Sequence, residues 1–115
     1  MTDIFDQIDL FMLLPRRNVW IVDEAMDIYL RKSSRVVEGK GYNFIDFASI
    51  EVTKQGEGFF TAFLAEFRKM YPTKNIFVES ILNKRFAEFL VKKGFTIIPN
   101  HEPQIDAYLL NQSIQ

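Results

Sequence analysis

The sequence contains no cysteine and a single histidine, His101. The absence of cysteine excludes disulfides, thiolate metal sites and a cysteine nucleophile. Transition-metal sites are usually built from several histidines and cysteines, so we expect no metal. Because small secreted domains commonly depend on disulfides, the composition favours a cytoplasmic protein.

Long apolar runs are also missing. The longest, Leu10–Leu14, ends at Pro15 and is far shorter than the roughly 20 residues that a membrane helix needs. The first residues are acidic and interrupted by charge, unlike a secretory signal or a transit peptide. We therefore expect a chain that does not enter a membrane.

The chain has no excess of charge of one sign. It carries 14 Lys and Arg residues against 15 Asp and Glu residues, a net charge of -1. This balance argues against nucleic acid as a partner, because nonspecific nucleic-acid binders are normally basic. Apolar residues, in contrast, are plentiful: they make up 48% of the 115 residues, and twelve are Phe. We expect one core in a single domain spanning residues 1–115.

Hydrophobic periodicity predicts helices and strands along the whole chain. The expected helices span residues 3–14 and 59–71, with a third that Asn83 caps and Gly94 ends. The expected strands span residues 18–23, 27–32, 42–52, 75–82, 95–98 and 107–110. Residues 33–40 either extend the second strand or form a loop.

The order of these elements predicts an α/β fold (an α+β mixed sheet). Strand–helix–strand units in the second half imply a parallel pair with a right-handed crossover. The first half implies an antiparallel meander. Residues 42–52 are largely apolar on both faces, so we expect a central strand that is covered on both sides.

A glycine-containing turn joins this central strand to the following helix, within Glu51–Phe63. Backbone N–H groups at such a helix start, together with the helix dipole, can hold a phosphate without a charged side chain. The alternative is an ordinary turn in which glycine supplies the backbone angles. The spacing alone leaves both interpretations open.

Two sequence blocks resemble the GNAT family of N-acetyltransferases. The first, Gln55-Gly56-Glu57-Gly58-Phe59-Phe60, resembles the family's pyrophosphate-binding turn, Gln/Arg-x-x-Gly-x-Gly/Ala. The second resembles the family's Asn-x-x-Ala-x-x-hydrophobic-Tyr-x-x-hydrophobic-Gly-Phe pattern. Its matching residues, at the same relative spacing, are Asn83, Phe89, Gly94 and Phe95. The blocks occur in the family's order, and the resemblance extends over about residues 18–110.

The resemblance implies a GNAT-like acyl-CoA N-acyltransferase fold that transfers an acetyl group from acetyl-CoA to an amine. The residues that it assigns to binding acetyl-CoA or CoA are Val52, Gln55, Gly56, Glu57, Gly58, Phe59, Phe60 and Asn83. The transfer needs a base, and family members often use a carboxylate on or beside the central strand. Asp46 is the best-placed candidate and Glu51 the second. The alternative for Asp46 is a carboxylate at a strand bulge or edge that simply reaches water.

A second hypothesis is a catalytically inactive GNAT-fold protein, of a phage or accessory type, that binds, inhibits or assembles with a partner protein. Phe60 replaces the family's small residue in the turn, and Leu90 stands where many members carry the tyrosine that protonates the leaving thiolate. The first half is also short. Phe5, Phe11 and Trp20 in this half could form an interface, including that of a homodimer.

Overall fold

The structure is a computed structural model that describes residues 2–24, 26–52, 58–81, 83–99 and 104–110. Helices and strands follow one another in the order that the sequence predicts. The helices are α1 (Thr2–Leu13), α2 (Phe59–Met70) and α3 (Lys84–Lys92). The strands are β1 (Asn18–Val22), β2 (Met26–Val37), β3 (Lys40–Val52), β4 (Asn75–Ile81), β5 (Thr96–Pro99) and β6 (Ile105–Leu109).

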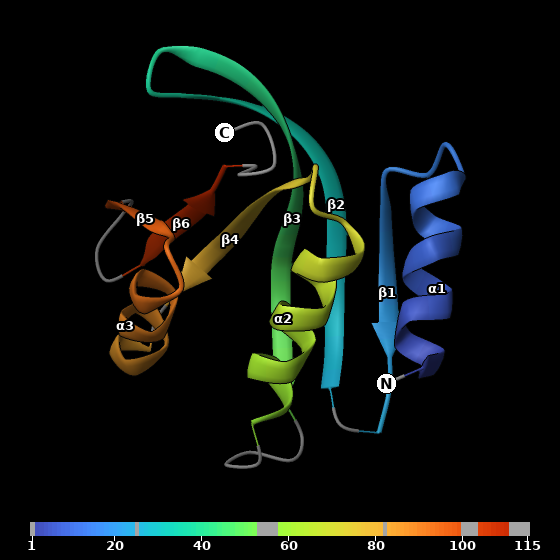
Figure 1. The fold of residues 1–115 in the computed structure, drawn as a ribbon. Helices are drawn as coiled ribbons and strands as arrows, with labels where there is room; N and C mark the ends of the chain where they lie inside the picture. The colour runs from blue at the N-terminus through green and yellow to red at the C-terminus, as the bar shows by residue number, and fades with distance from the viewer. Residues whose placement is uncertain (1, 25, 53–57, 82, 100–103, 111–115) are drawn as a thin grey trace.

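The strands form one mixed sheet in the order β1-β2-β3-β4-β6-β5 (Figure 1). β1, β2 and β3 make an antiparallel meander. β3 and β4 are parallel, and α2 crosses between them. β6 lies between β4 and β5 and is antiparallel to both. The expected mixed sheet is therefore confirmed, and β3 lies in its interior.

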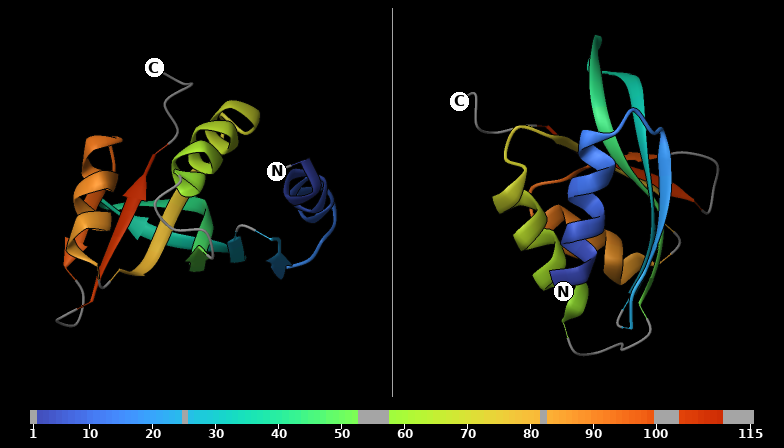
Figure 2. Two further views of the ribbon diagram at one scale, coloured as in Figure 1. Left: turned by 90° about the horizontal axis from the view of Figure 1, so that it is seen from below. Right: turned by 90° about the vertical axis from the view of Figure 1, so that its right-hand side faces the viewer.

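All three helices pack against the same face of the sheet (Figure 2). The ring of Phe5 on α1 stacks on that of Phe63 on α2, with centroids 5.4 Å apart. Phe63 in turn contacts Phe47 of β3 at 5.8 Å. One large apolar core thus joins the helices to one side of the sheet.

No helix among the described residues covers the other face of β3, a strand that the sequence predicts to be covered on both sides. A long β2–β3 hairpin covers part of that face instead, and its end curls over β4 and β6 (Figure 1). Its turn is Glu38-Gly39, and both residues have positive φ, at 51° and 78°. This backbone is typical of a tight two-residue hairpin turn. Residues 33–37 therefore extend the second strand.

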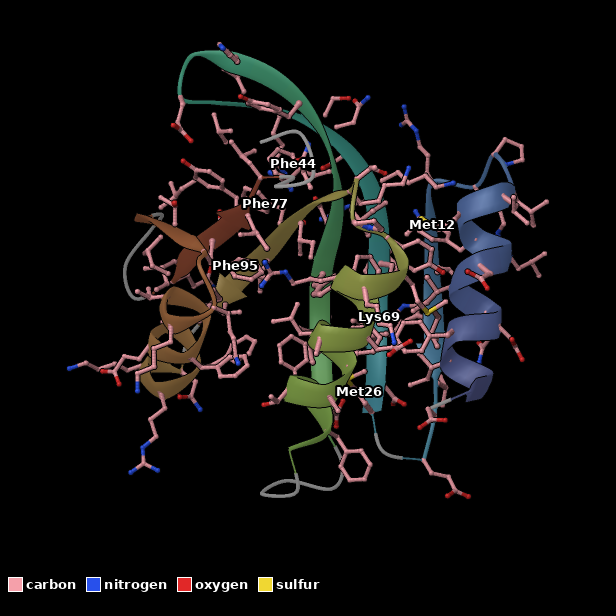
Figure 3. The ribbon with its side chains drawn as sticks, viewed as in Figure 1. Met12, Met26, Phe44, Lys69, Phe77 and Phe95 are labelled. Atoms are coloured by element: carbon pink, nitrogen blue, oxygen red, sulfur yellow. The ribbon has the colours of Figure 1, made fainter. Side chains whose placement is uncertain are left out.

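Side chains of the hairpin, β4 and β6 make a second, smaller apolar cluster on that face. Its buried members are Val37, Phe44, Phe77 and Tyr108. The rings of Phe44 and Phe77 lie 5.6 Å apart and are labelled in Figure 3. The hydroxyl of Tyr108 donates a hydrogen bond of 2.8 Å to Glu38, which ties the hairpin turn to β6. The hairpin thus covers part of the second face of β3.

The aromatic residues of the first half have different environments. Phe5 and Phe11 are buried in the core, so they form no exposed interface. Trp20 is 57% exposed and contacts Tyr29 of the neighbouring strand, with ring centroids 4.9 Å apart. Of the three residues suggested for an interface, only Trp20 is exposed.

Candidate functional site

The parallel strands β3 and β4 separate along their length, and a cavity lies between them. Their pairing runs from Phe44 opposite Asn75 to Phe47 opposite Val78 and then ends. The cavity beyond has a volume of about 350 Å³. It is lined by Phe47, Ala48, Ser49, Ile50, Val78, Glu79, Ser80, Ile81, Asn83 and Phe86.

A bulge in β3 begins at the point of separation. Tyr29 of β2 pairs with Ser49, whereas the next residue, Leu30, pairs with Phe47. Ala48 is therefore an extra residue on β3, and such a bulge bends a strand and increases its twist. The bulge directs β3 away from β4.

β4 has an irregularity of its own at the same level. Its register with β6 shifts between Val78 and Ile81. Between them Ser80 has a positive φ of 55°, and its N–H donates to Oδ1 of Asp106 at 2.9 Å. β4 is thus held toward β6, which keeps the space beside β3 open.

The cavity has an apolar side and a polar side. Phe47, Val78 and Ile81 belong to the helix-side core. Ser49 is exposed, and the Glu79 side chain is 21% exposed. A ligand in the cavity would therefore contact apolar groups next to a carboxylate.

Glu79 belongs to a charged cluster formed by Arg31, Arg35, Asp46 and Glu79. Arg35 Nη2 donates to Oδ2 of Asp46 at 2.7 Å and to Oε2 of Glu79 at 3.1 Å. Arg31 is hydrogen-bonded to Glu79, and its Nε lies 3.5 Å from Asp46 Oδ2. Asp46 is completely buried and also accepts from Ser33 Oγ at 2.7 Å. Buried charges need such partners because desolvation is costly.

The pKa of Glu79 is raised above the ordinary value of glutamate. Burial is the main cause, and the nearby Asp46 raises it further. Arg31 opposes both effects, but the net direction is upward. Beside a cavity, a carboxylate whose pKa is raised is a stronger base than an ordinary glutamate, which suits it to accepting a proton.

The turn before α2 is described only from Gly58 onward. Gln55, Gly56 and Glu57 lie outside the described residues, as does the side chain of Val52. Gly58 is the N-cap of α2, with a φ of 70° that favours glycine. A Cβ added at Gly58 would have nothing within 4 Å, so the turn is open on this side.

Phe60 packs between α2 and α3. Its ring centroid lies 5.1 Å from that of Phe86, 6.2 Å from that of Phe89 and 6.4 Å from that of Phe47. These rings join the first turn of α2 to α3, next to the cavity that Phe86 and Phe47 line. Phe59 is half-buried at the same helix start.

Asn83 caps α3, as the sequence predicts. Its Oδ1 accepts from the backbone N–H of Arg85 at 2.9 Å and of Phe86 at 3.2 Å. Asn83 also lines the cavity. Because Oδ1 accepts both capping hydrogen bonds, the side-chain N–H groups of Asn83 are the ones that could contact a ligand.

The structure separates the two predicted bases from the cavity. Asp46 is buried behind Glu79 and does not line it. Glu51 is exposed near the end of β3, opposite Asp27 of β2. Leu90 is fully buried in the core, and Phe95 is buried as well. His101 lies outside the described residues.

Sequence reasoning missed Glu79, Arg31 and Arg35. Each residue had a local signal in the sequence. Glu79 interrupts the apolar strand β4, and Arg31 and Arg35 lie four residues apart on β2. Their contact depends on the register of three strands, which the sequence pattern does not specify.

Comparisons with protein-family models, with curated proteins and with solved structures find no match to this chain. Among the described residues, no helix is long and apolar enough to cross a membrane. The described part of the chain also contains no group of three or more acidic or histidine side chains that could hold a metal ion.

Proposed function

We propose that this protein is an acyl-CoA-dependent N-acetyltransferase acting on a primary amine, with a GNAT-like acyl-CoA N-acyltransferase fold. The observation that carries the proposal is the cavity between two adjacent parallel strands, beside the start of α3, the helix that follows β4. Crevices at the carboxyl ends of parallel strands are common ligand sites.

The order of elements supports this proposal. The central strand β3 leads through the Gly58 turn into α2, and β4 leads through Asn83 into α3. These are the positions at which the two sequence blocks resemble the family. The residues present also fit the cofactor's arm, because about 350 Å³ is within the usual range for small-molecule pockets. The turn at Gly58 would hold the pyrophosphate.

Acetyl-CoA would supply the thioester carbonyl carbon, to which the amine forms a C–N bond as the C–S bond breaks. Glu79 would take one proton from the substrate ammonium, directly or through water, so that the neutral amine attacks. The second proton that the nitrogen loses would go to the departing CoA thiolate. Asp46, held by Ser33 and Arg35, would position the cluster around Glu79 without touching the substrate. Backbone N–H groups of β3 beyond the last β3–β4 pair, where Ala48 and Ser49 line the cavity, would polarise the carbonyl oxygen.

Thermal unfolding with acetyl-CoA tests this function. A ligand that binds the folded state raises the melting temperature progressively with its concentration, and 100 times its Kd stabilises by about 2.7 kcal/mol. We expect such a rise with acetyl-CoA and a smaller one with ADP, which lacks the pantetheine arm. Release of free CoA thiol in the presence of a panel of primary amines then tests transfer. No stabilisation at millimolar acetyl-CoA would refute the proposal.

One observation favours the inactive protein-binding alternative. The Phe60, Phe86 and Phe89 rings occupy the contact between α2 and α3, where the family has a small residue in place of Phe60. If the Phe60 ring closes the cofactor path, acetyl-CoA should stabilise a Phe60→Ala variant but not the wild type; if the protein does not bind CoA at all, it should stabilise neither. A partner protein would then be the expected ligand.

A further inference from the structure

A second and larger cavity lies at the other end of the β3–β4 pair, away from the proposed acyl-CoA site. Its volume is about 670 Å³. Met12, labelled in Figure 3 near the C-terminal end of α1, is one of its lining residues. The others are Arg17, Lys32, Ser33, Ser34, Asn43, Phe44, Ile45 and Lys74.

This lining is cationic. It brings together Arg17 from the segment after α1, Lys32 from β2 and Lys74 from the turn before β4. No carboxylate is among the described lining residues. The nearby Asp9 on α1 accepts a hydrogen bond from the hydroxyl of Tyr71 instead.

Lys32 is fixed in place. Its Nζ donates to the backbone oxygen of Phe11 at 2.8 Å and to that of Leu14 at 2.7 Å, so it caps the C-terminal end of α1. It also lies 4.5 Å from the centroid of the Phe11 ring. An ammonium group has three N–H donors, so one remains for a ligand.

Backbone contacts hold the other sides of the cavity. The N–H of Lys32 donates to the backbone oxygen of Arg17 at 2.8 Å, which ties the segment carrying Arg17 to β2. The N–H of Lys74 donates to the backbone oxygen of Tyr71 at 3.1 Å. The segments that carry the exposed cations Arg17 and Lys74 are therefore anchored before any ligand binds.

Asn43 adds a neutral donor. Its Oδ1 accepts from Ser34 Oγ at 2.9 Å, and its backbone oxygen accepts from Asn75 Nδ2 at 2.9 Å. These contacts orient the side-chain amide and leave its N–H groups as donors.

Lys32 and Lys74 are close enough for their charges to repel each other. Burial lowers the pKa of Lys32, and repulsion from Lys74 lowers it further. A bound anion would relieve this repulsion. A single carboxylate would match only one of the three cations, whereas a phosphate chain carries several charges and several acceptor oxygens.

We propose that the cavity formed by Arg17, Lys32 and Lys74 binds a phosphate-bearing small molecule through a di- or triphosphate chain. Its volume of about 670 Å³ is within the usual range for small-molecule sites. This site is separate from the proposed acyl-CoA cavity and does not depend on acetyl transfer.

Titration of ¹⁵N-labelled protein with sodium tripolyphosphate, followed by NMR, tests the proposal. We expect saturable shifts of the amide signals of residues 32–34, 43–45 and 74. Arg17→Ala and Lys74→Ala should each weaken binding about tenfold, since a hydrogen bond to a charged group contributes about 1.5 kcal/mol or more. Lys92→Ala is the matched control, because it removes a lysine at an exposed position of α3. This variant should bind tripolyphosphate as the wild type does.

The outcomes that would overturn the proposal are distinct. Shifts confined to Gly58 and Phe59 would place the phosphate on the turn before α2. Equal affinity in the wild type, Arg17→Ala and Lys74→Ala would mean nonspecific attraction. A DNA oligonucleotide that binds here while tripolyphosphate does not would identify a nucleic-acid backbone as the ligand.

Discussion

Asp46 and Glu79 accept hydrogen bonds from the same nitrogen of Arg35, at 2.7 and 3.1 Å. The two carboxylates come from neighbouring parallel strands, and they differ in exposure. Asp46 is completely buried, whereas the Glu79 side chain is 21% exposed and lines the cavity. Carboxylates in different environments can take different roles, which here favours Glu79 for proton transfer and Asp46 for positioning.

Glu79→Gln should abolish most of the proposed acetyl transfer, because an amide cannot accept the proton. We expect kcat to fall about a thousandfold, within the usual range for a general base. Glu88→Gln, on the exposed side of α3, should leave kcat unchanged.

The pH dependence provides a second readout for the same residue. Glu79 must be ionised to act as a base, and its pKa lies above 4.5, the ordinary value. We expect kcat/KM of the wild type to rise with pH through this raised pKa, and the rise to be absent in Glu79→Gln. A rise that persists in the variant would assign the base to another group.

The elements could be predicted from the sequence because each has a local cause. The spacing of Ile4, Ile8 and Phe11 predicts α1, and all three are buried. The sequence leaves open whether the strand of residues 27–32 continues, because Ser33, Ser34 and Arg35 resemble a polar loop. In the structure Ser33 and Arg35 bind Asp46 across the sheet, so the strand continues to Val37.

The candidate site was harder to predict because its contacts are distant in sequence. Arg31 and Glu79 are 48 residues apart, and they meet only through the pairing of β2, β3 and β4. The position of Asp46 in an apolar run indicated burial, but not that the partly exposed Glu79 would lie in front of it. The residues assigned to the cofactor turn, Gln55–Glu57, lie outside the described residues, and their role stays a prediction.

Two substitutions at Gly58 separate backbone strain from blocked binding. Its φ of 70° disfavours any side chain, so Gly58→Ala and Gly58→Trp should both lose about 1 kcal/mol of stability. The space around a Cβ is open, so alanine adds no clash. If the cofactor binds this turn, only tryptophan should abolish stabilisation by acetyl-CoA. Equal stabilisation of both variants by acetyl-CoA would show that the cofactor does not bind this turn.

Asn83 allows its capping role to be distinguished from a ligand contact. Asn83→Ala should cost about 1 kcal/mol, because the cap to Arg85 and Phe86 is lost. Asn83→Asp keeps the accepting oxygen but removes the amide donors and adds negative charge. We expect Asn83→Asp to retain the wild-type melting temperature and to bind acetyl-CoA more weakly. Unchanged affinity would show that Asn83 is only a cap.

Alkaline unfolding tests the link between the hairpin and β6. The hydrogen bond to Glu38, with burial as a second cause, raises the pKa of Tyr108 above 10. The folded protein therefore keeps this proton after the unfolded chain has lost it. The resulting stabilisation is complete below pH 10 and is lost as pH rises through the raised pKa.

Tyr108→Phe removes both the hydrogen bond and this titration. At pH 7 we expect a loss of about 1 kcal/mol, or about 4 °C in melting temperature. Above pH 10 the difference between variant and wild type should shrink, because the wild-type bond is lost as Tyr108 ionises. Tyr42→Phe is the matched control, since it removes a tyrosine hydroxyl from the hairpin side of the same apolar cluster. A constant difference across this pH range would show that the Tyr108 hydroxyl does not hold the hairpin on β6.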